Sequence, residues 1–86
     1  MADIQELFEQ AAEDSKSLSE KPSNETLLQL YSLYKQGSIG DVNVEPPSNP
    51  FDFVAKAKYE AWASLKGMST HNAMTDYIEL VKKLKG

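Results

Sequence analysis

The sequence contains no cysteine and no arginine among its 86 residues. Without cysteine, neither a disulfide nor a thiolate–metal site can reinforce the fold, and the composition suits a reducing cytosol. Because every cation is a lysine, any phosphate site must use point charges and lacks the bidentate guanidinium fork. No apolar run approaches the roughly 18 residues of a membrane span. The start of the chain, residues 1–6, has neither a basic segment nor an apolar signal core. We therefore expect a small cytoplasmic protein.

The motifs of catalysis and of metal binding are also missing. The chain has no nucleophile elbow, no Gly-rich phosphate loop and no zinc-ligand spacing. His71 is the only histidine, and no second ligand faces it at helical spacing, which favours a surface helix position over a metal site. A net charge of −4 argues against general nucleic-acid binding. The sequence thus predicts no catalytic residues, no metal or other cofactor, and no nucleic-acid partner.

The chain is long enough for one small domain, residues 1–86, that buries about 60% of its unfolded surface. Four segments have helical apolar spacing and are separated by proline, glycine and serine. We expect helices at about residues 3–18, 23–37, 50–66 and 70–84. Ser23 and Ser69 are the expected caps of the second and fourth helices, while Asn49 caps the third and Pro50 fills its first position. The predicted fold class is all-α.

The longest connection in the chain runs from Ser38 to Ser48. Gly40-Asp41 indicates a turn, and Pro46-Pro47 blocks both helices and strand ladders. About eleven residues is more than a tight helix hairpin needs. This connection can therefore cross the domain and join two neighbouring parallel helices.

The segment from Leu27 to Lys35 is the most apolar of the predicted helices. At about 100° per residue its leucines and tyrosines cover an arc of roughly 220°. A helix with so wide an apolar arc must contact neighbours on more than one side, so we expect it to be central. We expect the apolar face of the third helix to comprise Phe51, Val54, Ala55, Ala61, Trp62 and Leu65.

Two lysines fall inside these apolar faces. Lys35 lies beside Tyr31 on the second helix, and Lys58 lies in the middle of the face of the third. Because a buried unpaired ammonium is costly, each lysine must either extend its charge to water or meet an anion. Two such lysines on separate helices of an acidic protein indicate a shared anion, with the hydroxyls of Tyr31 and Tyr34 nearby. The alternative that both lysines simply reach solvent remains open.

Several stretches of the chain resemble the acyl-CoA-binding protein family, over about residues 3–85. The matching residues are Tyr31-Ser-Leu-Tyr34-Lys35-Gln36 with Gly40-Asp41-Val42-Asn43, Lys56-Ala57-Lys58-Tyr59-Glu60-Ala61-Trp62 with Leu65-Lys66-Gly67, Ala73-Met74 with Tyr77-Ile78, and the single positions Phe8, Ala11-Ala12, Lys16 and Pro22. The resemblance implies a four-helix bundle of up-down-down-up topology with Ser38–Ser48 as its long crossover. It also implies a carrier of long-chain fatty acyl-CoA esters in the cytosol that buffers them and delivers them to lipid-metabolising enzymes without catalysis.

The resemblance also assigns roles to residues by position. It implies that Tyr31, Lys35 and Lys58 hold the 3′-phosphate of the adenosine, and that Tyr34 lies against the adenine. The other residues that it places in the site are Lys16 and Tyr77 at the edges, Leu28, Ser32 and Leu33 among the ligand contacts, and Ala11, Ala12, Leu27 and Leu28 along the acyl groove. Family members often carry a ligand-contacting lysine where this chain has Val54, so one polar contact is expected to be absent. From its own helix pattern, Tyr77 is most simply expected at the edge of the core with its hydroxyl in water.

The expected partners follow from this ligand. We expect acyl-CoA-using enzymes as recipients, at most transient membrane contact, and a monomer. The main alternative is a helical protein-interaction module whose wide apolar arc receives a partner helix, but it gives no reason for two inward lysines. A peripheral membrane helix is disfavoured because the basic residues do not line one face of an amphipathic helix.

Overall fold

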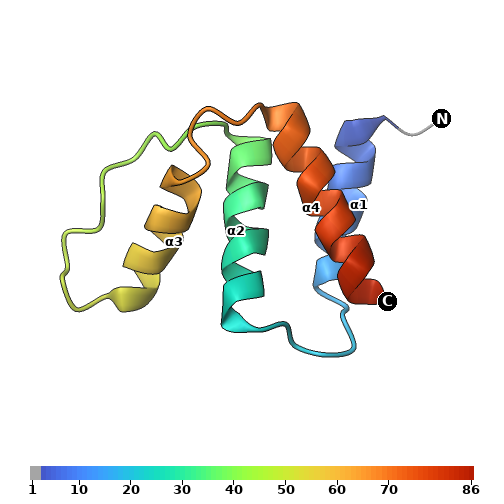
Figure 1. Cartoon of the computed structure of the whole chain (residues 1–86), viewed down its shortest axis with the longest axis horizontal. Coiled ribbons are helices and arrows are strands. Elements are labelled where there is room, and N and C mark those ends of the chain that lie inside the picture. The colour runs from blue at the N-terminus through green and yellow to red at the C-terminus, as the bar shows by residue number, and fades with distance from the viewer. Residues whose placement is uncertain (1–2) are drawn as a thin grey trace.

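The computed structural model describes residues 3–86, in which four α-helices and no strand occur. The helices are α1 (Ile4–Ser15), α2 (Asn24–Ser38), α3 (Phe53–Ala63) and α4 (Thr70–Lys85), shown in Figure 1. The predicted all-α fold class is confirmed. Residues 1 and 2 of the predicted domain lie outside the described residues.

A side-chain cap precedes every helix. Asp3, Ser23, Asp52 and Ser69 each accept a hydrogen bond from the backbone N–H three residues further on, at 2.9–3.2 Å. These bonds satisfy one of the amide donors that a helix start leaves without an intrahelical partner. The predictions for Ser23 and Ser69 are confirmed.

The expected start of the third helix is wrong. Asp52, and not Asn49, caps α3 by accepting from the N–H of Ala55 at 3.0 Å. Asn49 instead accepts from the N–H of Phe51 at 3.0 Å, which forms a tight turn before the helix. The helix also ends at Ala63, three residues before the expected end, and a turn follows up to Gly67. Gly67 has a φ of +96°, a left-handed conformation that glycine adopts without strain.

The first helix is also shorter than expected, because α1 ends at Ser15 and not at Leu18. The N–H groups of Lys16 and Ser17 bond to carbonyls three residues back, those of Glu13 and Asp14. The helix therefore ends in a tighter turn of the 3₁₀ type, after which the chain leads to α2.

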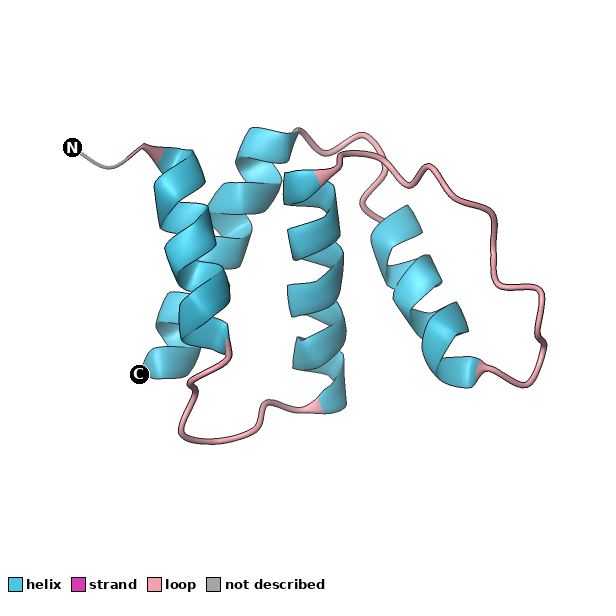
Figure 2. Cartoon of the chain, turned by 180° about the vertical axis from the view of Figure 1, so that it is seen from behind, coloured by secondary structure: helices cyan, strands magenta, loops and turns pink. Residues whose placement is uncertain are grey.

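The helices have the topology that the resemblance implied. In Figure 1, α1 and α4 run in one direction and α2 and α3 in the other. The long connection of residues 39–52 therefore joins two parallel helices, as Figure 2 shows from behind. Helix α2 packs against both α3 and α4, and α4 also packs against α1. The predicted central place of the second helix is confirmed.

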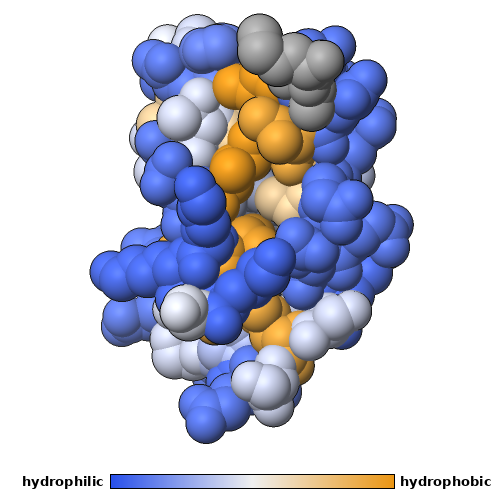
Figure 3. All heavy atoms as spheres, turned by 90° about the vertical axis from the view of Figure 1, so that its right-hand side faces the viewer, coloured by the Kyte–Doolittle hydropathy of each residue, from blue (hydrophilic) through white to orange (hydrophobic). Residues whose placement is uncertain are grey.

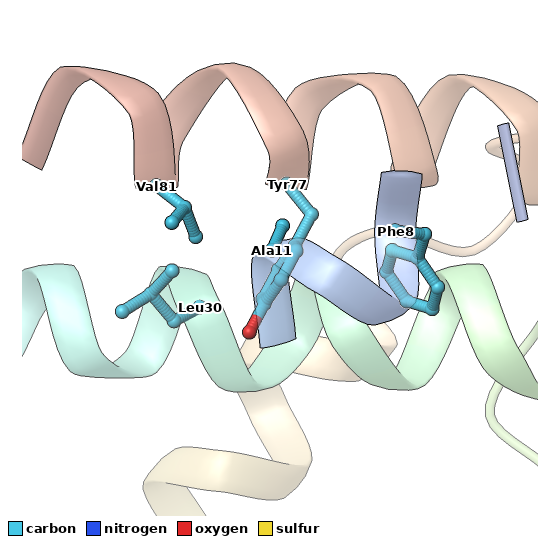
Figure 4. Packing of buried hydrophobic residues seen from close by; sticks show 5 residues of the cluster. All are labelled: Phe8, Ala11, Leu30, Tyr77 and Val81. Atoms are coloured by element: carbon cyan, nitrogen blue, oxygen red, sulfur yellow. The ribbon is translucent and has the colours of Figure 1, made fainter. Parts of the chain in front are cut away.

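The hydrophobic core comes from three of the four helices. Phe8 and Ala11 of α1, Leu30 of α2, and Tyr77 and Val81 of α4 form a buried cluster (Figure 4). Helix α3 contributes nothing to this cluster; its buried residue, Trp62, lies at its C-terminal end. Helix α3 therefore lies outside the main core.

The predicted apolar face of the third helix is wrong at its N-terminal end. Phe51 is 80% exposed and Val54 is 65% exposed, whereas Trp62 is only 3% exposed. Phe51 precedes the helix, so the helical wheel does not apply to it. Since α2 is the main helical neighbour of α3, only a narrow face of α3 is covered.

The side of the molecule formed by α1 and α4 carries a narrow apolar seam between hydrophilic flanks (Figure 3). Leu7 of α1 is 47% exposed.

No helix within residues 3–86 combines the length and the apolar character needed to cross a bilayer.

Candidate ligand-binding site

An open groove of about 860 Å³ lies between α1 and α2. Its lining residues are Gln5, Glu6, Phe8, Glu9, Gln10, Ala12, Glu13, Ser15 and Lys16 of α1 and the turn after it, Leu30, Tyr31, Tyr34 and Ser38 of α2, and Tyr77 of α4. The groove exists because α1 and α2 both pack on α4 and face each other across small side chains such as Ala12 and Ser15.

Three aromatic rings in mutual contact form the apolar base of the groove. The ring of Phe8 lies 5.3 Å from that of Tyr34 in a stacked arrangement and 5.2 Å from that of Tyr77 in an edge-to-face arrangement. Both arrangements suit the charge distribution of aromatic rings. Phe8 and Tyr77 are buried, but Tyr34 is 43% exposed and so offers part of its surface to a ligand.

The hydroxyl of Tyr77 was expected to lie in water, but it is bonded within the protein. It donates to Ser15 Oγ at 3.2 Å, and Ser15 in turn donates to the carbonyl of Ala12 at 2.7 Å. Burial raises the pKa of Tyr77, an effect that the hydrogen bond to Ser15 partly opposes. The phenol is therefore neutral at physiological pH and fixes α4 to the end of α1.

A cluster of two cations surrounds Tyr31. The Nζ atom of Lys35 lies 5.8 Å from the Tyr31 ring centroid, and the Nζ atom of Lys58 on α3 lies 5.3 Å from it. Lys35 also lies over the Trp62 ring at 5.6 Å. Each contact is a cation–π interaction. The structure thus brings together on one ring two lysines that are 23 positions apart in the chain.

Neither of these lysines is neutralised by a carboxylate. The ion pairs found within residues 3–86 join Lys16 to Glu13 at 3.8 Å and Lys85 to Asp14 at 3.1 Å. Lys35 is half-buried and Lys58 is exposed, and neither takes part in an ion pair within residues 3–86. Two cations around one ring, with no carboxylate paired to either, form a local positive site on an acidic protein.

A smaller hollow of about 250 Å³ lies on the other side of Tyr31. Its walls are Val44, Glu45 and Pro47 of the crossover and Ala55, Lys58, Tyr59 and Trp62 of α3. Tyr31 lines both spaces, whereas Lys58 lines the smaller hollow alone and Lys35 lines neither.

Seven of the expected site residues lie at the groove or at the lysine cluster around Tyr31. Ala12, Lys16, Tyr31, Tyr34 and Tyr77 line the groove, and Lys35 and Lys58 meet at Tyr31.

The other expected residues do not line the groove. Ala11 belongs to the buried core, while Leu27 and Leu33 pack against it. Ser32 is buried, and its hydroxyl donates to the carbonyl of Gln29 at 3.1 Å. Leu28 is half-buried and lines neither space. A helical wheel defines an apolar arc but does not say which neighbour covers each part of it.

The acidic rim of the groove was not anticipated from the sequence. Glu9 and Glu13 of the first helix are exposed and line the groove. Glu9 lies three residues before Ala12 and therefore shares its face, a spacing that was available as a signal.

This arrangement of helices and side chains matches known proteins. A family model described as acyl CoA binding protein matches residues 5–81. The chain belongs to the acyl-CoA-binding protein family. The acyl-CoA-binding protein of Ricinus communis is 46% identical over 83 residues, which cover 96% of this chain and 91% of that protein. The acyl-CoA-binding protein of Dictyostelium discoideum is 48% identical over 77 residues, 90% of each chain.

The solved structures agree with this membership. The crystal structure of Oryza sativa acyl-CoA-binding protein 2 superposes on this fold with a TM-score of 0.88 at 43% sequence identity, covering 94% of this chain and 87% of that chain. The resemblance identified from the sequence motifs is therefore confirmed at the level of family and fold.

Proposed function

We propose that this protein binds long-chain fatty acyl-CoA esters and carries them in the cytosol to lipid-metabolising enzymes. The observation that carries the proposal is the meeting of two lysines without counter-ions at Tyr31, next to an open groove with an aromatic base. Family membership supports it, since the relatives are named for binding acyl-CoA. The family is one of non-catalytic binding proteins, so the chain is not an enzyme.

The chemistry of the site fits the three parts of such a ligand. An acyl-CoA has an anionic phosphorylated head, a flat adenine and a long apolar tail. Lys35 and Lys58 hold the 3′-phosphate of the adenosine through charge-assisted hydrogen bonds, with Tyr31 between them. Tyr34 is stacked on Phe8 on one side, and its exposed surface receives the adenine.

The tail lies in the groove between α1 and α2. Ala12 leaves room for it, while Phe8 and Leu30 give it an apolar surface. Each methylene that leaves water contributes about 0.8 kcal/mol at most. Lys16 and Tyr77 act at the edges, whereas Ala11, Leu27 and Leu33 support the groove from behind.

The protein acts as a monomer that releases its ligand unchanged. Its recipients are enzymes that use acyl-CoA, and any membrane contact is transient. Because no cofactor takes part, ligand exchange depends only on affinity and on access to the groove.

A calorimetric titration tests the proposal with three ligands: a long-chain acyl-CoA, bare CoA and the matching free fatty acid. We expect the acyl-CoA to bind at least about a hundredfold more tightly than either part, because head and tail contacts are both needed. Equal affinity for the acyl-CoA and the free fatty acid would exclude the proposed phosphate site. No free thiol is expected to appear during the titration of a highly purified sample.

A further inference from the structure

A buried polar network lies beside the site without lining it. Gln36 is fully buried, and its amide nitrogen donates to Asp41 Oδ1 at 2.9 Å and to the carbonyl of Met68 at 2.8 Å. The same Asp41 oxygen accepts from the N–H of Gly67 at 2.8 Å. We call these contacts the Gln36–Asp41 network. It joins the end of α2, the start of the crossover and the turn between α3 and α4.

A second hydrogen bond closes the same junction. The indole N–H of Trp62 donates to the carbonyl of Gly40 at 2.9 Å, directly before Asp41 in the chain. Trp62 is the buried residue of α3. The C-terminal end of α3 is therefore fixed to Gly40 through Trp62, and the turn after it is fixed to Asp41 through Gly67.

The remainder of α3 is weakly held. Among the described helices its packing partner is α2, and it contributes nothing to the main core. Its first turn leaves Phe53 71% exposed and Val54 65% exposed. The placement of α3 against α2 consequently depends on its C-terminal end, where the network lies.

The network is adjacent to the two lysines of the site. Lys35 directly precedes Gln36 on α2, and Lys58 lies one turn before Trp62 on α3. Both cations lie on Tyr31 without a counter-ion, and like charges repel each other. The network and the bond from Trp62 join the C-terminal ends of the two helices that carry these lysines.

We propose that Gln36 and Asp41 are positioning residues of the ligand site: their network holds Lys58 beside Tyr31 and Lys35 so that both ammonium groups meet one phosphate. Neither residue touches the ligand. The amide of Gln36 must present its nitrogen to the network because both of its partners there are acceptors. The N–H of Gly67 and then the Gln36 amide lower the pKa of Asp41. The inference rests on the proposed acyl-CoA function.

The test compares a long-chain acyl-CoA with the same acyl ester of 3′-dephospho-CoA by calorimetric titration. Asp41→Ala should weaken acyl-CoA binding about tenfold while leaving the dephospho ligand within about twofold. Asp41→Asn retains an acceptor oxygen for Gly67 and should recover most of the affinity. In a Lys58→Met background, Asp41→Ala should have no further effect, because the lysine that it positions is gone.

Asp3→Ala is the matched control, since it removes the same charge and also an acceptor of a backbone N–H, but at the start of α1. It should leave the preference for the 3′-phosphate unchanged. Trp62 is the only tryptophan in the chain, so its fluorescence reports on the junction directly. We expect a red-shifted emission in Asp41→Ala while the helical circular dichroism is retained.

Three results would overturn the proposal. In the first, Asp41→Ala lowers the affinity for both ligands equally. In the second, Asp41→Ala weakens acyl-CoA binding as much in the Lys58→Met background as in the wild type. In the third, the wild-type protein binds both ligands with equal affinity. In each case wild-type binding of acyl-CoA would leave the proposed function standing. A wild-type protein that binds neither ligand would instead reject the function itself.

Discussion

Tyr31 is the residue at which the site converges, and Lys35 is the partner whose role can be tested most directly. Its ammonium makes cation–π contacts with Tyr31 and Trp62, at 5.8 and 5.6 Å from their rings. Such contacts contribute about 0.5–1 kcal/mol each at exposed sites. Removing the charge also relieves repulsion with Lys58, so the two effects on folding oppose each other.

We predict that Lys35→Met changes the free energy of unfolding of the empty protein by no more than about 1 kcal/mol. The same substitution should weaken acyl-CoA binding by about 2 kcal/mol, the low end for a charge-assisted contact in a site open to water. Urea denaturation and a binding titration measure the two effects. Lys56→Met is the control, because Lys56 is an exposed lysine of α3. A large loss of stability with unchanged affinity would show that Lys35 is structural.

Tyr77 allows a separate test of the core behind the groove. Tyr77→Phe keeps the buried ring against Phe8 but removes the hydrogen bond to Ser15. We predict a loss of about 0.5–1.5 kcal/mol in the free energy of unfolding, because one part-buried hydrogen bond is lost and Ser15 still donates to Ala12. Urea denaturation measures it, with Tyr59→Phe as the control. An unchanged stability would mean that this bond does not form in solution.

The caps at Ser23 and Ser69 could be predicted from the sequence because the hydrogen bond of a cap reaches only three residues along the chain. The same signals failed at α3, where Asn49 and Asp52 are both good caps and the choice depends on how the crossover packs. The places of Lys35 and Lys58 on apolar helix faces were predicted from helical spacing, but their common contact with Tyr31 could be found only from the fold. The bond between Tyr77 and Ser15 joins residues 62 positions apart, and no pattern in the sequence indicates it.

Helix α3 should be the least protected of the four helices. It lies outside the core cluster, has one buried side chain and packs mainly on α2. Segments with few buried contacts open at a free energy below that of global unfolding. We predict that the backbone amides of α3 exchange with deuterium faster than those of α2 and α4 in the empty protein. Saturation with acyl-CoA should slow them, since Lys58 belongs to α3; equal protection of all helices would contradict this picture.

The whole molecule is thin, with Cα extents of 44 × 28 × 15 Å. The groove between α1 and α2 is open to solvent. In so thin a molecule the core is small, and polar links between distant segments add to it. Two such links use carboxylates: Asp14 binds Lys85 near the C-terminus, and Asp41 binds Gly67.

The pKa shifts of these two carboxylates allow us to predict how the stability of the protein depends on pH. The Gln10 amide and then the Lys85 ammonium lower the pKa of Asp14, and the N–H of Gly67 and then the Gln36 amide lower that of Asp41. A carboxyl group whose pKa is lower in the folded state binds its proton more weakly there than in the unfolded chain. Its contribution to stability is therefore complete above the unfolded pKa of about 3.9 and is lost as the pH falls through the lower folded value.

We predict that the double variant Asp14→Asn/Asp41→Asn loses less stability than the wild type when the pH falls from about 6 to about 2.5, because two titrations linked to folding are gone. Urea denaturation midpoints measured at several pH values in this range give the slope of stability against pH for each protein. Asp76→Asn/Glu79→Gln is the matched control: it removes the same charge from exposed positions of α4 that form no side-chain hydrogen bond or ion pair within residues 3–86. If both double variants reduce the slope equally, the effect comes from net charge and not from the two links. A slope that changes only in the first variant assigns the acid sensitivity to the contacts that tie α4 to α1 and the end of α3 to α2.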